Sequence, residues 1–267
     1  MATPALANSG ASLNGVSCTS PSSCMAVGNE GTPKNPTLFT LAESWNGTAW
    51  RFLTTPPPLT PGGTALSTVS CASPSTCMAA GYYGFSNGFG TSLTLSEQWN
   101  GTAWQRRDTP TPGNSGVLAG VSCTSATSCK AVGSHAVATG NPGNATLAEQ
   151  WGGKHWKAQP TPNPAGAGAA GFDAVSCTSA STCMATGASL DQTGENQFTL
   201  AEAWNGTNWS LLHTPSPGSF GDELHGVSCA SAPACMAVGE FTGIGNEMTL
   251  AESWNGASWS VVKTPRP

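Results

Sequence analysis

The side chains that could do chemistry in this 267-residue sequence stand at positions where a regular pattern varies. Asp173 and His225 each lie four residues before a cysteine, and the same position elsewhere holds Asn14, Ser67 and Ala119. A carboxylate beside an imidazole can act as an acid/base pair or bind a cation. The alternative is that these side chains form a polar rim around one mouth of a central channel, where they hold water. We expect that rim, with no catalytic residue, metal or cofactor, and keep Asp173 and His225 as the alternative catalytic pair.

Other candidate ligand residues lie in segments that differ between the copies of a repeat. Aromatic side chains there can serve as platforms for a polar ligand, since binding sites combine apolar surfaces with a few polar groups. The predicted ligand-binding residues are Asn14, Tyr82, Tyr83, Phe85, Asp173, Asp191, Glu195, His225, Glu240 and Phe241. A glycoside hydrolase would need two carboxylates about 5 to 10 Å apart. For that reaction the candidate pairs join Asp173 to Asp191, Glu195 or Asp222.

The repeat that carries these residues is marked by pairs of cysteines separated by five residues. The first cysteines follow one another at spacings of 53, 52, 54 and 52 residues. A period near 50 residues with strand-like contents is typical of propellers and solenoids, whose units bury their faces against one another. The five pairs are Cys18 and Cys24, Cys71 and Cys77, Cys123 and Cys129, Cys177 and Cys183, and Cys229 and Cys235.

Each copy of the repeat predicts four strands. In the first copy these are residues 13–18, 24–28, 38–45 and 50–53, with an Asn-Gly turn signal before the last and proline after it. The expected fold is all-β: a five-bladed β-propeller with four antiparallel strands and one disulfide per blade. We expect one domain over residues 1–267, with contiguous blades, neighbouring termini and no strand exchange. The predicted blades are 11–56, 64–110, 116–160, 170–215 and 222–265.

The glycines and tryptophans of the repeat resemble those of the kelch family of β-propellers. In that family a glycine follows the second strand and a tryptophan opens the fourth. The matching glycines are Gly28, Gly81, Gly133, Gly187 and Gly239, and the matching tryptophans are Trp50, Trp104, Trp156, Trp209 and Trp259. The chain has one glycine where kelch repeats usually have two, so it resembles a divergent form of the family. The form it resembles is of a secreted bacterial type. It implies the propeller fold.

The cysteine pairs indicate disulfides across the first hairpin of each blade, where cross-strand distances suit the bond. Zinc is the alternative, but a tetrahedral site needs four ligands and each pair supplies two. Persistent disulfides imply an oxidising compartment, so we expect a secreted or extracellular protein.

One glutamate recurs two residues before the first tryptophan of each copy. We expect Glu43, Glu97, Glu149, Glu202 and Glu252 to be structural and to accept hydrogen bonds from their own or the next blade. We also expect the paired tryptophans to belong to the core.

Composition narrows the function. Charged residues make up 9% of the chain and the net charge is -5, so there is no basic stripe for nucleic acid. No apolar run is long enough to span a membrane. We predict a monomeric binding module for carbohydrate or a cell-surface polymer, acting through a face of variable loops and without turnover. A glycoside hydrolase or lyase with acids at the channel mouth, or a purely structural scaffold, is the alternative.

Overall fold

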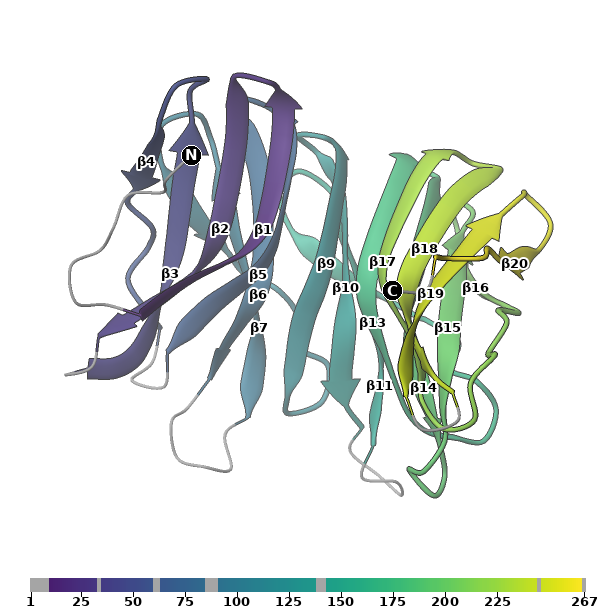
Figure 1. The fold of residues 1–267 in the computed structure, drawn as a ribbon. Coiled ribbons are helices and arrows are strands. Elements are labelled where there is room, and N and C mark those ends of the chain that lie inside the picture. Colours follow the sequence, from purple (N-terminus) through teal and green to yellow (C-terminus); the bar gives the residue numbers. More distant parts are fainter. Residues whose placement is uncertain are drawn as a thin grey trace. The chain divides into compact units, whose positions relative to one another are not determined.

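The computed structural model describes residues 10–32, 35–59, 63–84, 91–137, 143–243 and 246–265. These residues form twenty β-strands and, in the ranges described, no helix (Figure 1). Accordingly, this part of the chain has no helical segment with the length and hydropathy needed to cross a membrane.

The strands form five four-stranded antiparallel sheets. The first contains β1 (Gly10–Ser20), β2 (Ser23–Thr32), β3 (Asn35–Trp45) and β4 (Trp50–Leu53). The second contains β5 (Thr64–Ser73), β6 (Thr76–Gly84), β7 (Ser92–Trp99) and β8 (Trp104–Arg107). The third contains β9 (Gly116–Ser125), β10 (Ser128–Ala136), β11 (Asn144–Trp151) and β12 (Trp156–Gln159). The fourth contains β13 (Ala167–Ser179), β14 (Thr182–Asp191), β15 (Gln197–Trp204) and β16 (Trp209–Leu212). The fifth contains β17 (Asp222–Ser231), β18 (Ala234–Thr242), β19 (Glu247–Trp254) and β20 (Trp259–Val261).

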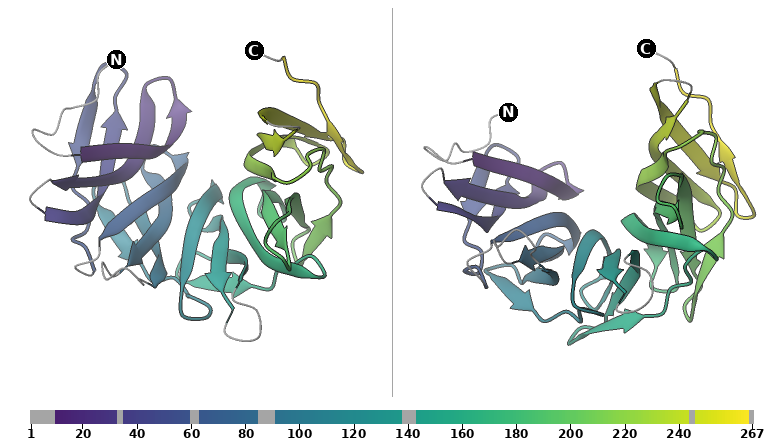
Figure 2. Two further views of the ribbon diagram at one scale, coloured as in Figure 1. Left: turned by 60° about the horizontal axis from the view of Figure 1, so that its bottom comes forward. Right: turned by 90° about the horizontal axis from the view of Figure 1, so that it is seen from below.

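Each sheet is built from four consecutive strands, so every blade comes from contiguous sequence, as predicted. Figure 2 shows this as one run of colour per sheet. The contacts group the chain into two compact units. One is Met1–Ala131 with Gln150–Lys157, and the other is Val132–Glu149 with Ala158–Pro267. Closure of the ring, neighbouring termini and the single domain stay predictions.

All ten cysteines form the predicted disulfides, one in each sheet. Cys18 and Cys24 face each other across the β1–β2 hairpin, with their Cα atoms 4.0 Å apart. No cysteine is free, so the zinc alternative for these pairs is wrong.

A bulge on the first strand explains the glycine of the repeat. Leu13 pairs with Gly28 and Gly15 pairs with Val27, which leaves Asn14 as an extra residue on β1. A Cβ atom at Gly28 would overlap the carbonyl oxygen of Ser12 on that strand. The glycine therefore lies inside the second strand, where the backbones approach closely, rather than after it as the kelch pattern suggested.

The connection to the fourth strand is a four-residue loop. Asn46 Oδ1 accepts hydrogen bonds from Thr48 and Ala49, and Gly47 has a φ of 93°. In the third sheet Gly153 takes this place with a φ of 89°, as expected if the turn needs a left-handed residue. The flanking tryptophans pair, with ring centroids 5.7 Å apart for Trp45 and Trp50.

Adjacent sheets inside each unit are joined by a repeated hydrogen bond. The backbone N–H of Cys71 donates to Ser17 Oγ at 3.0 Å, and the N–H of Cys229 donates to Ser176 Oγ at the same distance. Apolar side chains fill the rest of these interfaces. Between the fourth and fifth sheets they include Met184, Leu224, Leu250 and Trp259.

The repeated glutamates are buried, but the hydrogen bonds expected for them are largely absent. Glu97 Oε1 accepts from Thr40 Oγ1 at 3.4 Å. Both carboxyl oxygens of Glu149, Glu202 and Glu252 lack a partner among the described residues. The expectation is therefore wrong for these three, because apolar strands enclose the position. Burial raises the pKa of Glu149 and Glu202 to about 8.

Candidate functional site

In the fourth and fifth sheets, the variable position four residues before the first cysteine is a bulge residue of the first strand. The register shifts between Phe172 and Ala174 on β13 and between Leu224 and Gly226 on β17. Asp173 and His225 are thus the extra residues of the fourth and fifth sheets. A bulge leaves its residue outside the ladder and re-aims the side chain, which is why this position can change while the valine two residues later does not.

The bulges of the fourth and fifth sheets bring three ionisable side chains together. One carboxylate oxygen of Asp173, one of Glu223 and a ring nitrogen of His225 all lie within 4.8 Å of one another. Asp173 comes from β13, whereas Glu223 and His225 come from β17. The predicted pair of Asp173 and His225 therefore meets, and a second carboxylate joins it.

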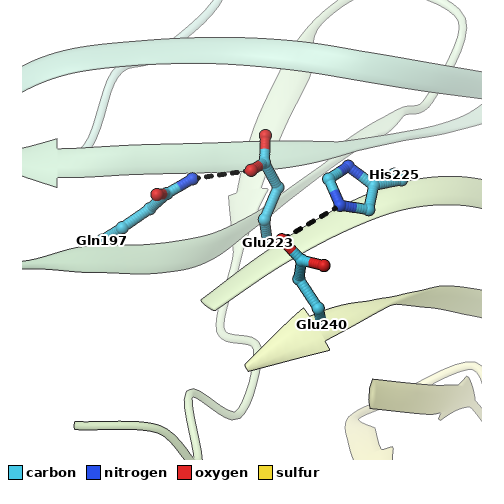
Figure 3. Close-up of polar contacts among 4 residues, drawn as sticks. All are labelled: Gln197, Glu223, His225 and Glu240. Carbon is cyan, nitrogen blue, oxygen red and sulfur yellow. Dashed lines mark hydrogen bonds and ion pairs between the residues drawn. The ribbon is translucent and has the colours of Figure 1, made fainter. Parts of the chain in front are cut away.

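Two further polar side chains surround this group (Figure 3). Gln197, at the start of β15, donates a hydrogen bond from Nε2 to Glu223 Oε2 at 2.9 Å. Glu240 on β18 lies across from Glu223, and its Oε1 is 3.8 Å from His225 Nε2. Polar groups from four strands of two neighbouring sheets thus converge on one place.

Burial and a neighbouring carboxyl group determine the electrostatics of Asp173. Burial makes the largest contribution and the negative charge of Glu223 adds to it, and together they raise the pKa of Asp173 to about 7. The nearby His225 acts in the opposite direction.

A hollow of about 190 Å³ opens beside these residues. Its lining includes the small side chains of Ala169, Ala170 and Ala188 together with Asp173, Gln197 and Glu223. Asn144 and Ser134 also belong to the lining. The hollow therefore has space beside the carboxyl groups for part of a ligand.

The alternative carboxylates proposed for a reaction with Asp173 do not belong to this group. Asp191 holds its own turn together, accepting from Thr193 Oγ1 at 2.7 Å and Asn196 Nδ2 at 2.6 Å. The hydrogen bonds from Thr193 and Asn196 lower its pKa to about 2. Glu195 donates its backbone N–H within the same turn. Asp222 is buried and accepts from the Gly218 N–H at 2.9 Å.

The remaining candidates are divided between core and surface. Asn14 donates to the Leu66 carbonyl at 3.0 Å. Tyr82 is exposed, whereas Tyr83 packs against the apolar core of the first unit. Phe241 packs against the core between the fourth and fifth sheets. Phe85 lies outside the described residues.

Glu223 is the residue that the list of predicted ligand residues missed. Its position was visible, since it lies two residues before His225 on the same strand. The bulge at His225 was not predicted, because the glycine that accompanies it, Gly239, was interpreted as a residue that follows the second strand.

Further hollows repeat between neighbouring sheets at the disulfide end. One is lined by Trp204, Trp254 and three cysteines of the fourth and fifth sheets, and the other by Trp45, Trp99 and three cysteines of the first and second. A hollow that recurs at equivalent positions follows from the repeat, so these are weaker candidates than the unique cluster.

Comparison with known proteins identifies the fold class. No protein-family model matches the sequence, and no curated protein matches it significantly. An ulvan lyase, described as a polysaccharide lyase bound to -[GlcA(1-4)Rha3S]-, has a TM-score of 0.51 and 8% identity over 89% of this chain and 68% of its own. YCF48 from Cyanidioschyzon merolae has a TM-score of 0.47 and 14% identity over 92% and 68%. YCF48 bound to a D1 peptide has a TM-score of 0.46 and 12% identity over 94% and 66%, so the chain spans just under two thirds of that structure.

These neighbours are β-propeller proteins, and with the ulvan lyase the similarity extends over most of the chain. Together with five four-stranded sheets, it places this protein in the propeller fold class. At this level of identity the similarity concerns the fold alone.

Proposed function

We propose that this protein is a secreted propeller that binds carbohydrate at the hollow beside Asp173, Glu223 and Gln197. The observation that carries the proposal is that two carboxyl groups and an amide meet in the lining of a hollow that also contains several alanines. Sugar hydroxyls donate to carboxylates and accept from amide N–H groups, so this set matches a saccharide. Charged residues make up only 9% of the chain, which makes such a group distinctive.

The fold and the disulfides support the same proposal. The ulvan lyase that shares the fold is described as bound to a saccharide, which is consistent with carbohydrate as the ligand. Five disulfides favour an oxidising, extracellular compartment, where glycans and cell-surface polymers are accessible. The kelch relationship and the monomeric state belong to this proposal and are open to test.

Binding without turnover is favoured over hydrolysis by the carboxyl geometry. Retaining glycosidases hold their two carboxyls about 5 to 5.5 Å apart, and inverting enzymes hold them farther apart. The nearest oxygens of Asp173 and Glu223 lie within 4.8 Å of each other, which is closer than either separation. A lyase is the second candidate, because His225 beside Asp173 offers an acid/base pair.

The test is a glycan array followed by titration calorimetry, with a broad glycosidase and lyase screen on the same material. We expect one class of saccharide to bind, and Asp173→Asn and Glu223→Gln to weaken that binding at least about tenfold. Glu247→Gln, an exposed glutamate outside the cluster, is the control and leaves binding unchanged.

The outcomes separate the candidates. Product release that Asp173→Asn abolishes would replace the binding module with an enzyme. A protein that binds no saccharide, or one whose binding is insensitive to both cluster substitutions, would contradict the proposed site. Circular dichroism of each variant shows that the sheets remain folded.

A further inference from the structure

We infer that Asp173, Glu223 and His225 form a binding site for one divalent metal ion of the zinc type. This goes beyond carbohydrate binding, because it concerns an ion that the three side chains would hold with or without a saccharide. Two carboxylate oxygens and one imidazole nitrogen within 4.8 Å of one another are the donors.

The spacing of the donors is close to what a bound ion requires. Zinc is held at about 2.0 to 2.2 Å by oxygen and nitrogen ligands, so two donors on one tetrahedral ion lie about 3.3 to 3.6 Å apart. The three donor atoms, which lie within 4.8 Å of one another, would have to approach by about 1 Å through side-chain rotation. His225 can make them, since about half of its side chain is exposed, at 51%.

The charges at the site also favour a cation. Asp173, Glu223 and Glu240 place three carboxyl groups around a single imidazole. The ion pair recorded at this site within the described residues joins His225 to Glu240, and no lysine or arginine takes part. A divalent ion placed between the Asp173 and Glu223 oxygens, which lie within 4.8 Å of each other, would attract both carboxylates at once.

Neighbouring side chains already orient the proposed ligands. Gln197 holds Glu223 through Oε2 at 2.9 Å, and Glu240 lies 3.8 Å from the imidazole of His225 (Figure 3). In metal sites such outer partners fix the rotamer of the ligating carboxylate and the orientation of the histidine ring. Gln197 and Glu240 thus have the role of positioning residues.

The donor set selects the type of ion. Calcium and magnesium favour all-oxygen ligands, whereas an imidazole combined with carboxylates suits zinc and neighbouring transition metals. Three protein ligands leave a coordination position open to water or a ligand. The corresponding bulge residues Asn14 and Ser67 are not metal ligands of this kind, so we expect one ion per chain.

The experiment is calorimetric titration of the full, oxidised chain with zinc chloride after dialysis against a chelator. We expect one zinc ion per chain, and His225→Gln and Asp173→Asn to weaken binding at least about tenfold. His213→Gln is the matched control, because His213 is exposed, lies in the same unit and is outside the cluster. Thiolates cannot contribute, since every cysteine is in a disulfide. Titration with cobalt adds a spectroscopic signature of tetrahedral coordination.

The results decide the question without reference to a saccharide. Zinc binding that His225→Gln loses and His213→Gln keeps supports the site. A chain that takes up no zinc, binds it equally in both histidine variants, or prefers calcium overturns the inference. If Asp173→Asn does not fold, the exposed His225→Gln still tests it. Because no glycan is present in this titration, its failure leaves the carbohydrate proposal standing, and the reverse also holds.

Discussion

Glu202 offers a test of how the repeat tolerates a buried carboxyl group. Its side chain is 0% exposed, and both of its oxygens lack a hydrogen-bond partner among the described residues. The residues paired with it across the sheet, Ala185 and Leu211, carry no charge. Burial alone raises its pKa from 4.5 to about 8. Replacing Glu202 with glutamine keeps the shape of the side chain and removes the titration.

The sign and size of the effect follow from proton linkage. Between pH 4.5 and about 8 the native protein keeps a proton on Glu202 that the unfolded chain loses. The free energy of unfolding therefore falls as the pH rises, with the stabilisation complete below pH 4.5 and lost above about 8. Each unit of pH in this window is worth about 1.4 kcal/mol. From pH 5 to pH 7 Glu202 should remove about 2 to 3 kcal/mol of stability.

The assay is denaturant unfolding of the oxidised protein at several values from about pH 5 to pH 8. We expect the loss of stability between pH 5 and pH 7 to shrink by about 2 kcal/mol in Glu202→Gln relative to the unsubstituted chain. The exposed Glu247→Gln serves as the control, with a change below about 0.5 kcal/mol. An equal pH dependence in Glu202→Gln and the unsubstituted chain would refute the reasoning, because it would mean that the buried carboxyl is solvated or partnered.

Two further predictions concern the frame of the repeat. Replacing Cys71 and Cys77 together by serine opens a short loop and should lower the free energy of unfolding by about 2 kcal/mol. The measurement is unfolding in denaturant. An unchanged midpoint would show that the disulfide does not constrain the unfolded chain. Gly187→Ala places a Cβ against the Gly171 carbonyl oxygen and should destabilise the protein by at least about 2 kcal/mol in thermal unfolding. Gly152→Ala meets no atom within 4 Å and should be nearly neutral in the same assay. Equal effects of the two substitutions would contradict the close backbone approach inferred at the bulge.

The sequence was sufficient to predict the repeated four-stranded sheet, because the residues that determine its hairpin, disulfide and turn lie close together in the chain. Cys18 and Cys24 lie on one hairpin, so their spacing alone predicted the disulfide and the pairing of β1 with β2. The replacement of Asn-Gly by Gly152-Gly153 predicted a left-handed residue, which Gly153 confirms. Strand ends were less accurate: β1 begins at Gly10 and β2 extends to Thr32, beyond the predicted segments.

The site was only partly predictable because it depends on contacts between sheets. The common register of Asp173 and His225 indicated them as an alternative pair, and their polar atoms lie within 4.8 Å of each other. Asp191 looked equally available as a free acid, yet the threonine and asparagine that follow it occupy its oxygens in a turn. The hydrogen bonds expected for the glutamates of the repeat were wrong for another reason, since recurrence in the sequence gives no information on which side chains pack against Glu202.

The bulge gives a physical reason why a site arises at one place in a repeated structure. In the first, second, fourth and fifth sheets, an extra residue lies at the same point of the first strand. That residue pairs with nothing across the ladder, so it can vary without loss of backbone hydrogen bonds. In the first sheet it is Asn14, whose amide donates to the Leu66 carbonyl of the second sheet. Where two successive sheets instead have Asp173 and His225, the same geometry directs ionisable groups toward each other, and Glu223 completes a set able to hold an ion. A site of the proposed kind therefore requires substitutions only at a few positions such as the bulge residues. The disulfides, glycines and tryptophans that build each sheet lie at other positions.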